Sequence, residues 1–219
     1  ALIFSVITGN KPVDLQYPSI VGGRLALLKG TALDDLNQKS AIAFEQTVNT
    51  LSKFGFEIKE IDIDEVESAL ALSGVLYPSE AYAEWMEEIE ASPELMYDEI
   101  LQRFRAGKDV SATDYLNAKR DLEVFKKKFY DKVSSFDGVI LPTCPILPPN
   151  LERLKSDKGY YVAQNLMALR NTRIGNLMGV CALTIPTNHS SCGLSIMSLP
   201  NTEEKLLRIG RVAENAILK

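Results

Sequence analysis

Residues 137–150, DGVILPTCPILPPN, place an apolar run directly before a proline-rich loop. The run Gly138–Leu141 has the unbroken apolar character of a strand buried in a sheet. Four prolines then fall within eight residues, at positions 142, 145, 148 and 149. Because proline has no N–H to donate to a neighbouring strand, the strand is expected to end at about Leu141. The stiffest backbone of the chain therefore lies just past the end of a core strand.

Upstream of this strand, the pattern predicts a strand, a helix and a second strand. Residues 23–28 follow the pair Gly22-Gly23 and indicate a short buried strand. Residues 31–55 have apolar side chains at helical spacing, with Thr31 as the expected cap and Gly55 as the left-handed stop. Residues 56–63 indicate the second strand. A strand–helix–strand unit of this size predicts two parallel strands.

The next seventy residues, 64–133, have a helical pattern almost throughout. The expected breaks are at Ser92-Pro93 and at residues 105–107. Ser111 and Asp114 resemble a capping box before a strong apolar stripe that runs to residue 133.

After the proline loop, a polar stretch reaches residue 159 and a helix is expected from about residue 160 to 178. Two strands, 181–187 and 192–200, are then expected on either side of a short loop, and whether they pair is left open. Asn201 or Thr202 is expected to cap a final helix. The pattern predicts an α/β fold with a mixed β-sheet flanked by helices and, over residues 1–219, no internal domain boundary.

Composition and charge argue against several kinds of partner. The chain has 219 residues, is 46% hydrophobic, and has a net charge of −5 with an isoelectric point of about 5.1. This balance argues against nucleic acid or an anionic membrane as the main partner. No apolar run has the length of a membrane span. Three scattered cysteines suggest reduced thiols and a cytoplasmic location, and a start at Ala1 suggests a processed chain or a fragment.

The sequence contains no self-contained catalytic constellation. A Ser/His/Asp or Cys/His enzyme needs an imidazole base, and His189 is the single histidine of the chain, in a turn-like run of polar residues. Cys144 is expected to be a small buried hydrophobe, because nothing near it in sequence would lower its pKa. The acidic clusters lack the glycine turn of a calcium loop, and no phosphate-loop motif accompanies the glycines. We therefore expect no metal and no organic cofactor.

Eight segments in order nevertheless resemble the C-terminal half of the amidase-signature hydrolases. They are ALIFSVITGNKPVD (1–14), GGRLALLKG (22–30), LSKFGFEIKEIDI (51–63), LYPSEAYAEW (76–85), AGKDVSATDYLNAKR (106–120), SFDGVILPTCP (135–145), NTRIGNLMGVCALTIP (171–186) and CGLSIMSLPNTEEKLLRIGRVAE (192–214). The resemblance spans nearly the whole chain and implies an amide hydrolase.

The same resemblance implies that the catalytic residues are absent from these 219 residues. The family uses a lysine, a serine in a cis linkage and a nucleophilic serine, all from a Gly/Ser-rich first half. No such run occurs in this sequence, and Ser190-Ser191 lacks the glycines. Cys181 also replaces the proline that is usual before the following strand, which implies a different substrate loop. The chain is thus expected to be one partial domain, inactive alone, that shapes the substrate cleft of a longer amidase.

Five residues are cleft candidates by their position in the family pattern, for a small-molecule amide substrate. The proline loop is expected either to form a rigid wall of that cleft or to be a stiff surface turn. The alternative role for each candidate is local capping and packing. They are Tyr77, Thr143, Asn171, Thr172 and Asn176.

Two other functions compete with this interpretation. One is a non-catalytic interaction module or truncated fragment that binds a partner through an exposed sheet edge. Such a fragment is expected to associate non-specifically or to form homo-oligomers. The other is a cysteine enzyme that uses Cys144 with His189 as its base. Slow labelling of Cys144 by iodoacetamide at neutral pH would contradict the second.

Overall fold

The fold is built on one mixed sheet of five strands in the order β2-β1-β3-β5-β4. The computed structural model describes residues 1–16 and 23–218. Strand β1 pairs in parallel with β2 and β3, whereas β5 pairs antiparallel with β3 and β4. This confirms the predicted α/β class and shows that the last two strands are neighbours. The strands are β1 Arg24–Leu28, β2 Glu57–Ile61, β3 Gly138–Pro142, β4 Cys181–Pro186 and β5 Gly193–Ser198.

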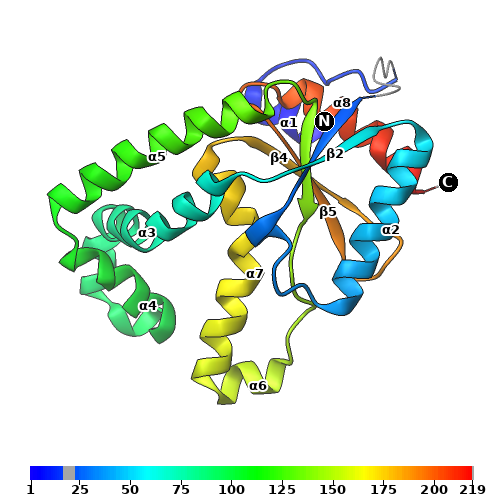
Figure 1. Ribbon diagram of the computed structural model, residues 1–219. Helices are drawn as coiled ribbons and strands as arrows, with labels where there is room; N and C mark the ends of the chain where they lie inside the picture. The colour runs from blue at the N-terminus through cyan, green and yellow to red at the C-terminus, as the bar shows by residue number, and fades with distance from the viewer. Residues whose placement is uncertain (17–22, 219) are drawn as a thin grey trace.

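Helices cover both faces of this sheet (Figure 1). Helices α2 and α8 pack on the face that carries Leu25, Ile140 and Ile196. Helices α3, α5 and α7 pack on the opposite face, which carries Leu141 and Met197. The helices are α1 Leu2–Thr8, α2 Gln38–Phe54, α3 Asp64–Ala91, α4 Asp98–Arg105, α5 Ala112–Val133, α6 Leu151–Ser156, α7 Lys158–Met178 and α8 Glu203–Ile217.

Residues 64–133 form a helical arm that extends away from the sheet (Figure 1). The arm consists of α3, α4 and α5 with two short 3₁₀ helices, Pro93–Leu95 and Ala106–Asp109, at the predicted breaks. The Ser111 hydroxyl accepts a hydrogen bond from the Asp114 N–H at 3.1 Å, as the capping-box pattern predicts. Phe129, 1% exposed, anchors the arm in the core beneath the sheet.

Several predicted boundaries were wrong, for local reasons. Thr31 does not cap the first long helix: residues 30–32 form a 3₁₀ turn, and the Asn37 side chain caps α2 by accepting from the Lys39 N–H at 2.9 Å. Gly55 does end α2, with a φ of 119° that favours glycine. Thr202 precedes α8, but its hydroxyl donates back to the Leu199 carbonyl and does not cap the helix.

The region after the proline loop is also more ordered than predicted. Residues 151–156 form α6, which the sequence analysis treated as part of a polar stretch, and the Asn150 side chain caps it. Helix α7 begins at Lys158, two residues earlier than expected. Strand β3 ends at Pro142, which sits at the last paired position. Of the predicted pair Gly22-Gly23, Gly22 lies outside the described residues.

Candidate functional site

Beyond the carboxyl end of β3, the side chain of Asn171 fastens two loops to α7. Asn171 is fully buried, and its Nδ2 donates to the carbonyl of Ala32 at 2.9 Å and to that of Pro142 at 2.7 Å. Its Oδ1 accepts from the Arg170 guanidinium at 3.2 Å. Every polar atom of this side chain therefore has a protein partner, and the group is called the Asn171 clamp below.

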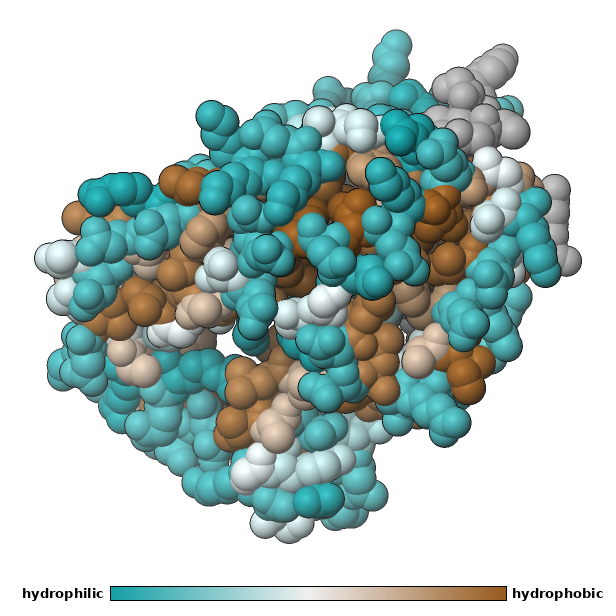
Figure 2. Space-filling view, in the orientation of Figure 1, coloured by the Kyte–Doolittle hydropathy of each residue, from teal (hydrophilic) through white to brown (hydrophobic). Residues whose placement is uncertain are grey.

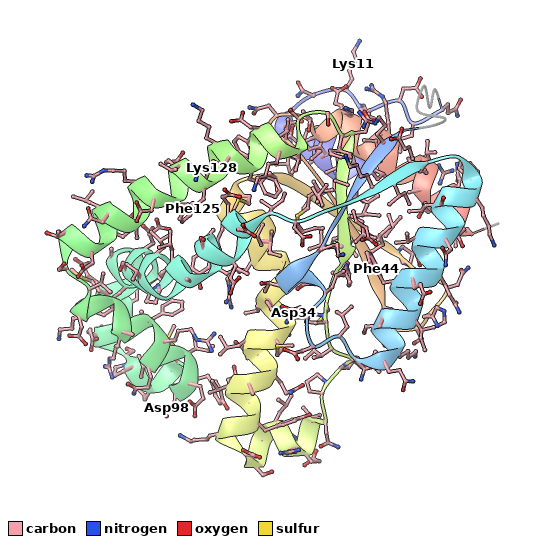
Figure 3. The ribbon with its side chains drawn as sticks, in the orientation of Figure 1. Lys11, Asp34, Phe44, Asp98, Phe125 and Lys128 are labelled. Atoms are coloured by element: carbon pink, nitrogen blue, oxygen red, sulfur yellow. The ribbon has the colours of Figure 1, made fainter. Side chains whose placement is uncertain are left out.

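Arg170 adds a second link between α7 and the loop that follows β1. Its Nη2 donates to the Asp34 carbonyl at 2.6 Å, and Figure 3 shows Asp34 between the end of β1 and α7. The N–H of Asn37 donates to the Pro145 carbonyl at 2.8 Å, which ties the proline loop to the start of α2. The proline loop is thus held by hydrogen bonds from two directions.

Thr143, at the end of β3, lies in a small cluster of hydroxyls. Its Oγ1 is 2.9 Å from Ser195 Oγ and 3.3 Å from Thr184 Oγ1. Its N–H donates to the Gly193 carbonyl at 2.9 Å, so the residue extends the β3–β5 ladder by one bond. These contacts show Thr143 linking three strands.

A cavity of about 430 Å³ lies between the helical arm and α7, and it is called the α7 pocket here. Three predicted residues line it: Tyr77 from α3, and Thr172 and Asn176 from α7. Its walls also include Phe104 and Leu166. Figure 2 shows a hollow between the arm and α7, with hydrophobic surface beside it. Pockets of this size, mainly apolar with a few polar groups, are typical of small-molecule sites.

Tyr77 lines the α7 pocket, and its hydroxyl is buried and has no hydrogen-bond partner within the described part of the chain. Burial raises the pKa of this phenol. The charge of Arg173 lowers the pKa and that of Glu80 raises it, each by less than burial does. The group therefore stays protonated at neutral pH and can donate a hydrogen bond. A buried hydroxyl without a partner is costly, which makes it a candidate for contact with a ligand.

Two arginines that were not among the predicted site residues also line the pocket. Arg173 from α7 and Arg103 from α4 both line the cavity. Arg103 Nη1 donates to Asn165 Oδ1 at 2.8 Å. Across residues 1–16 and 23–218, neither guanidinium forms an ion pair with a carboxylate. Arg173 is one helical turn from Leu169 and Asn176, so the pocket-facing spacing on α7 was a signal that could have identified it.

The far rim of the α7 pocket is closed by contacts between α4 and the start of α7. Lys158 forms ion pairs with Asp98 at 3.2 Å and with Glu99 at 3.1 Å. The rings of Tyr97 and Tyr161 meet edge to face with centroids 5.2 Å apart. Figure 3 shows Asp98 at the end of α4 that approaches α6 and α7. The start of α4 is therefore fastened to the start of α7 by two ion pairs and an aromatic contact.

The two residues of the cysteine-enzyme hypothesis bond to different helices. The Cys144 thiol lies 3.7 Å from the Ala168 carbonyl on α7. His189 Nε2 lies 2.7 Å from Gln46 Oε1 on α2. Within the described ranges, no group of three or more His, Cys, Asp or Glu side chains could hold a metal ion. In the same residues, none of the helices has the length and apolar character to span a bilayer.

Comparison with known proteins identifies the family. The model of the Amidase family matches residues 10–207, and the chain belongs to this family of amidase-signature hydrolases. A 2-amino-5-chloromuconic acid deaminase from Comamonas testosteroni is 31% identical over 185 residues, which cover 80% of this chain and 39% of that protein. An amidase from Pseudomonas putida is 27% identical over 235 residues, which cover 99% of this chain and 50% of that protein.

The fold comparison agrees. A crystal structure of an amidase superposes with a TM-score of 0.81 at 17% identity and covers 99% of this chain and 50% of that one. At this sequence identity the match shows a shared fold and nothing more. The chain spans about half the length of the curated relatives it matches.

Proposed function

We propose that this chain forms the substrate-binding side of an amide hydrolase, with the α7 pocket as part of the substrate cleft. The observation that carries the proposal is the convergence of Tyr77, Thr172 and Asn176 on that one cavity. These residues come from two helices about a hundred positions apart in sequence, and the family pattern alone had nominated them. The other two candidates, Thr143 and Asn171, hold the strand ends and loops in place beside it.

The chemistry proposed for the longer protein is acyl transfer to serine. A serine hydroxyl attacks the amide carbonyl, ammonia or an amine leaves, and water then hydrolyses the acyl-enzyme. The serines and the lysine would come from the part of the relatives that this chain does not span. The role of the residues described here is to bind the substrate and fix its orientation, which by itself contributes strongly to catalysis.

We also propose that residues 1–219 are one part of a larger domain. The outer edge of β2 carries the charged residues Glu57, Lys59 and Glu60, which discourage further pairing. The outer edge of β4 has no charged residue, and no strand of the described residues pairs with it. Helix α1 exposes four large apolar side chains, Leu2, Ile3, Val6 and Ile7. An apolar surface of this kind supports packing against further protein.

Two measurements on the purified chain test the proposal. Ammonia release from hexanamide is expected to stay at background, because the nucleophile is supplied elsewhere; sustained turnover would overturn the assignment of this chain to the substrate side. Amide ¹H–¹⁵N spectra recorded with hexanamide are expected to shift for residues of α3 and α7 around the pocket. Shifts confined to other regions would show that the cleft lies elsewhere.

A further inference from the structure

Arg103 and Arg173 bring positive charge to the α7 pocket, and neither forms an ion pair with an acidic side chain within the described residues. Arg173 is partly buried, and its guanidinium forms no hydrogen bond or ion pair within residues 1–16 and 23–218. Arg105, two residues after Arg103 on α4, shows the contrasting case: it holds Glu90 through two hydrogen bonds of 3.0 and 2.7 Å. Arg105 is neutralised by a carboxylate in this way, whereas Arg103 and Arg173, which line the pocket, form no ion pair within the described residues.

The neutral donor beside this charge is the Tyr77 hydroxyl. Tyr77 lines the same cavity as Arg173, and its hydroxyl is buried and has no partner within the described residues. Burial raises the pKa of the phenol, Arg173 lowers it, and Glu80 raises it. A ligand oxygen that meets both groups would accept a hydrogen bond from the phenol and from the guanidinium. Such charge-assisted bonds are about twice as strong as neutral ones.

Much of the remaining lining of the cavity is apolar and suits a hydrocarbon body. Leu166, Leu169 and Phe104 line it, together with Pro78 and Ala81 from α3. Ser73, Thr172 and Asn176 add polar side chains to the lining, and the section of a ligand that packs against the apolar residues is hydrocarbon. A ligand with an apolar middle and an anionic end would match both parts of the pocket.

We infer that the amide hydrolysed by the longer protein carries a carboxylate at the end remote from the scissile bond, held by Arg173 and the Tyr77 hydroxyl. This inference rests on the proposed function. The planar guanidinium fork matches the two oxygens of a carboxylate, and two arginines in one cavity exclude a cationic substrate by repulsion. The substrate class is therefore the monoamide of an aliphatic dicarboxylic acid, or a compound of the same chemistry.

The test compares two probes of equal length on the purified chain. Adipamate has an amide at one end and a carboxylate at the other, and hexanamide has a methyl group in place of the carboxylate. Dissociation constants are measured by ¹H–¹⁵N titration for the wild type, Arg173→Gln and Tyr77→Phe. Arg120→Gln is the matched control, because Arg120 is exposed on α5 outside the pocket and its guanidinium donates a hydrogen bond to the Asn117 side chain. Thermal unfolding confirms that each variant is folded.

Adipamate is expected to bind the wild type about tenfold or more tightly than hexanamide. Arg173→Gln is expected to abolish that preference, Tyr77→Phe to reduce it, and Arg120→Gln to keep it. Equal affinity for the two probes, with hexanamide bound in the pocket, would overturn the inference and leave the proposed function standing. A preference that survives Arg173→Gln would also overturn it. No shift at the pocket with either probe would overturn the inference and the proposed function together.

Discussion

Two residues of α7, two positions apart, use their polar side chains in opposite ways. Asn171 points toward the sheet, is fully buried, and has a protein partner for every polar atom. Arg173 lines the α7 pocket, and its guanidinium has no partner in the described part of the chain. The same helix therefore holds the loops together on one face and offers unsatisfied donors on the other. The satisfied side chain of Asn171 helps to maintain the fold, and the unsatisfied guanidinium of Arg173 is a candidate for ligand contact.

The largest effect is expected for the Asn171 clamp. Asn171→Ala removes the donor for two buried carbonyls, those of Ala32 and Pro142, and should lower the free energy of unfolding by about 2–4 kcal/mol. Urea denaturation measures this loss. The control Asn176→Ala changes an exposed residue on the same helix and should stay within about 0.5 kcal/mol of the wild type. If the two variants lose equally little, the clamp does not hold the loops.

A smaller effect is expected at Gly107, where the 3₁₀ helix Ala106–Asp109 packs against α3. A Cβ added to Gly107 would overlap the backbone carbonyl of Pro78, whereas one added to Gly74 would meet open space. Gly107→Ala should therefore destabilise the chain by about 1–3 kcal/mol, because backbone must move to make room. Gly74→Ala should be neutral or stabilising, since alanine is the better helix former. Urea denaturation of both variants checks the difference, and equal stability would mean that the arm adapts freely.

A pH-dependent effect of about 1 kcal/mol is expected at the start of β3. Burial alone would raise the pKa of Asp137, but hydrogen bonds from Lys205 and from the Arg24 N–H outweigh it and leave the pKa below 3.8. A carboxyl with a lowered pKa contributes stability above its unfolded pKa, and this contribution is lost as the pH falls through the folded pKa. Asp137→Asn should thus be destabilising at pH 7.

The control for this prediction is a comparison of the same two proteins at low pH, where Asp137 is protonated. Urea denaturation of the wild type and of Asp137→Asn at several values should show the difference shrinking as the pH drops below about 4. A constant difference from pH 7 to pH 3 would show that the charge of Asp137 does not contribute.

Local patterns predicted the elements of the fold well, because each rests on neighbouring residues. The apolar run at 138–141 gave β3, the capping box at Ser111 gave α5, and Gly55 gave the end of α2. The predicted cap at Thr31 was wrong, because Asn37 takes that role while its N–H bonds the distant proline loop. Long-range contacts of this kind leave no local signal.

The pocket was predictable only in part, for the same reason. The family resemblance nominated Tyr77, Thr172 and Asn176, and their substrate contacts stay a prediction. The helical spacing from Leu169 and Asn176 was a signal for Arg173, but no sequence pattern singled out Arg103 or showed that either guanidinium lacks an ionic partner. Their position in one cavity depends on how α4 packs against α7.

The smallest change in stability is expected for Tyr77→Phe, and comparing it with Tyr130→Phe separates a hydroxyl without a partner from a hydroxyl with one. Tyr77→Phe removes a buried hydroxyl that has no partner, so the free energy of unfolding should stay within about 0.5 kcal/mol of the wild type or rise. Tyr130→Phe is the matched case, because the Tyr130 hydroxyl donates to the Met178 carbonyl at 2.6 Å, and its loss should cost about 1 kcal/mol. Urea denaturation of both variants gives the comparison. A loss of more than 1 kcal/mol in Tyr77→Phe would mean that this hydroxyl already has a partner and is not reserved for a ligand.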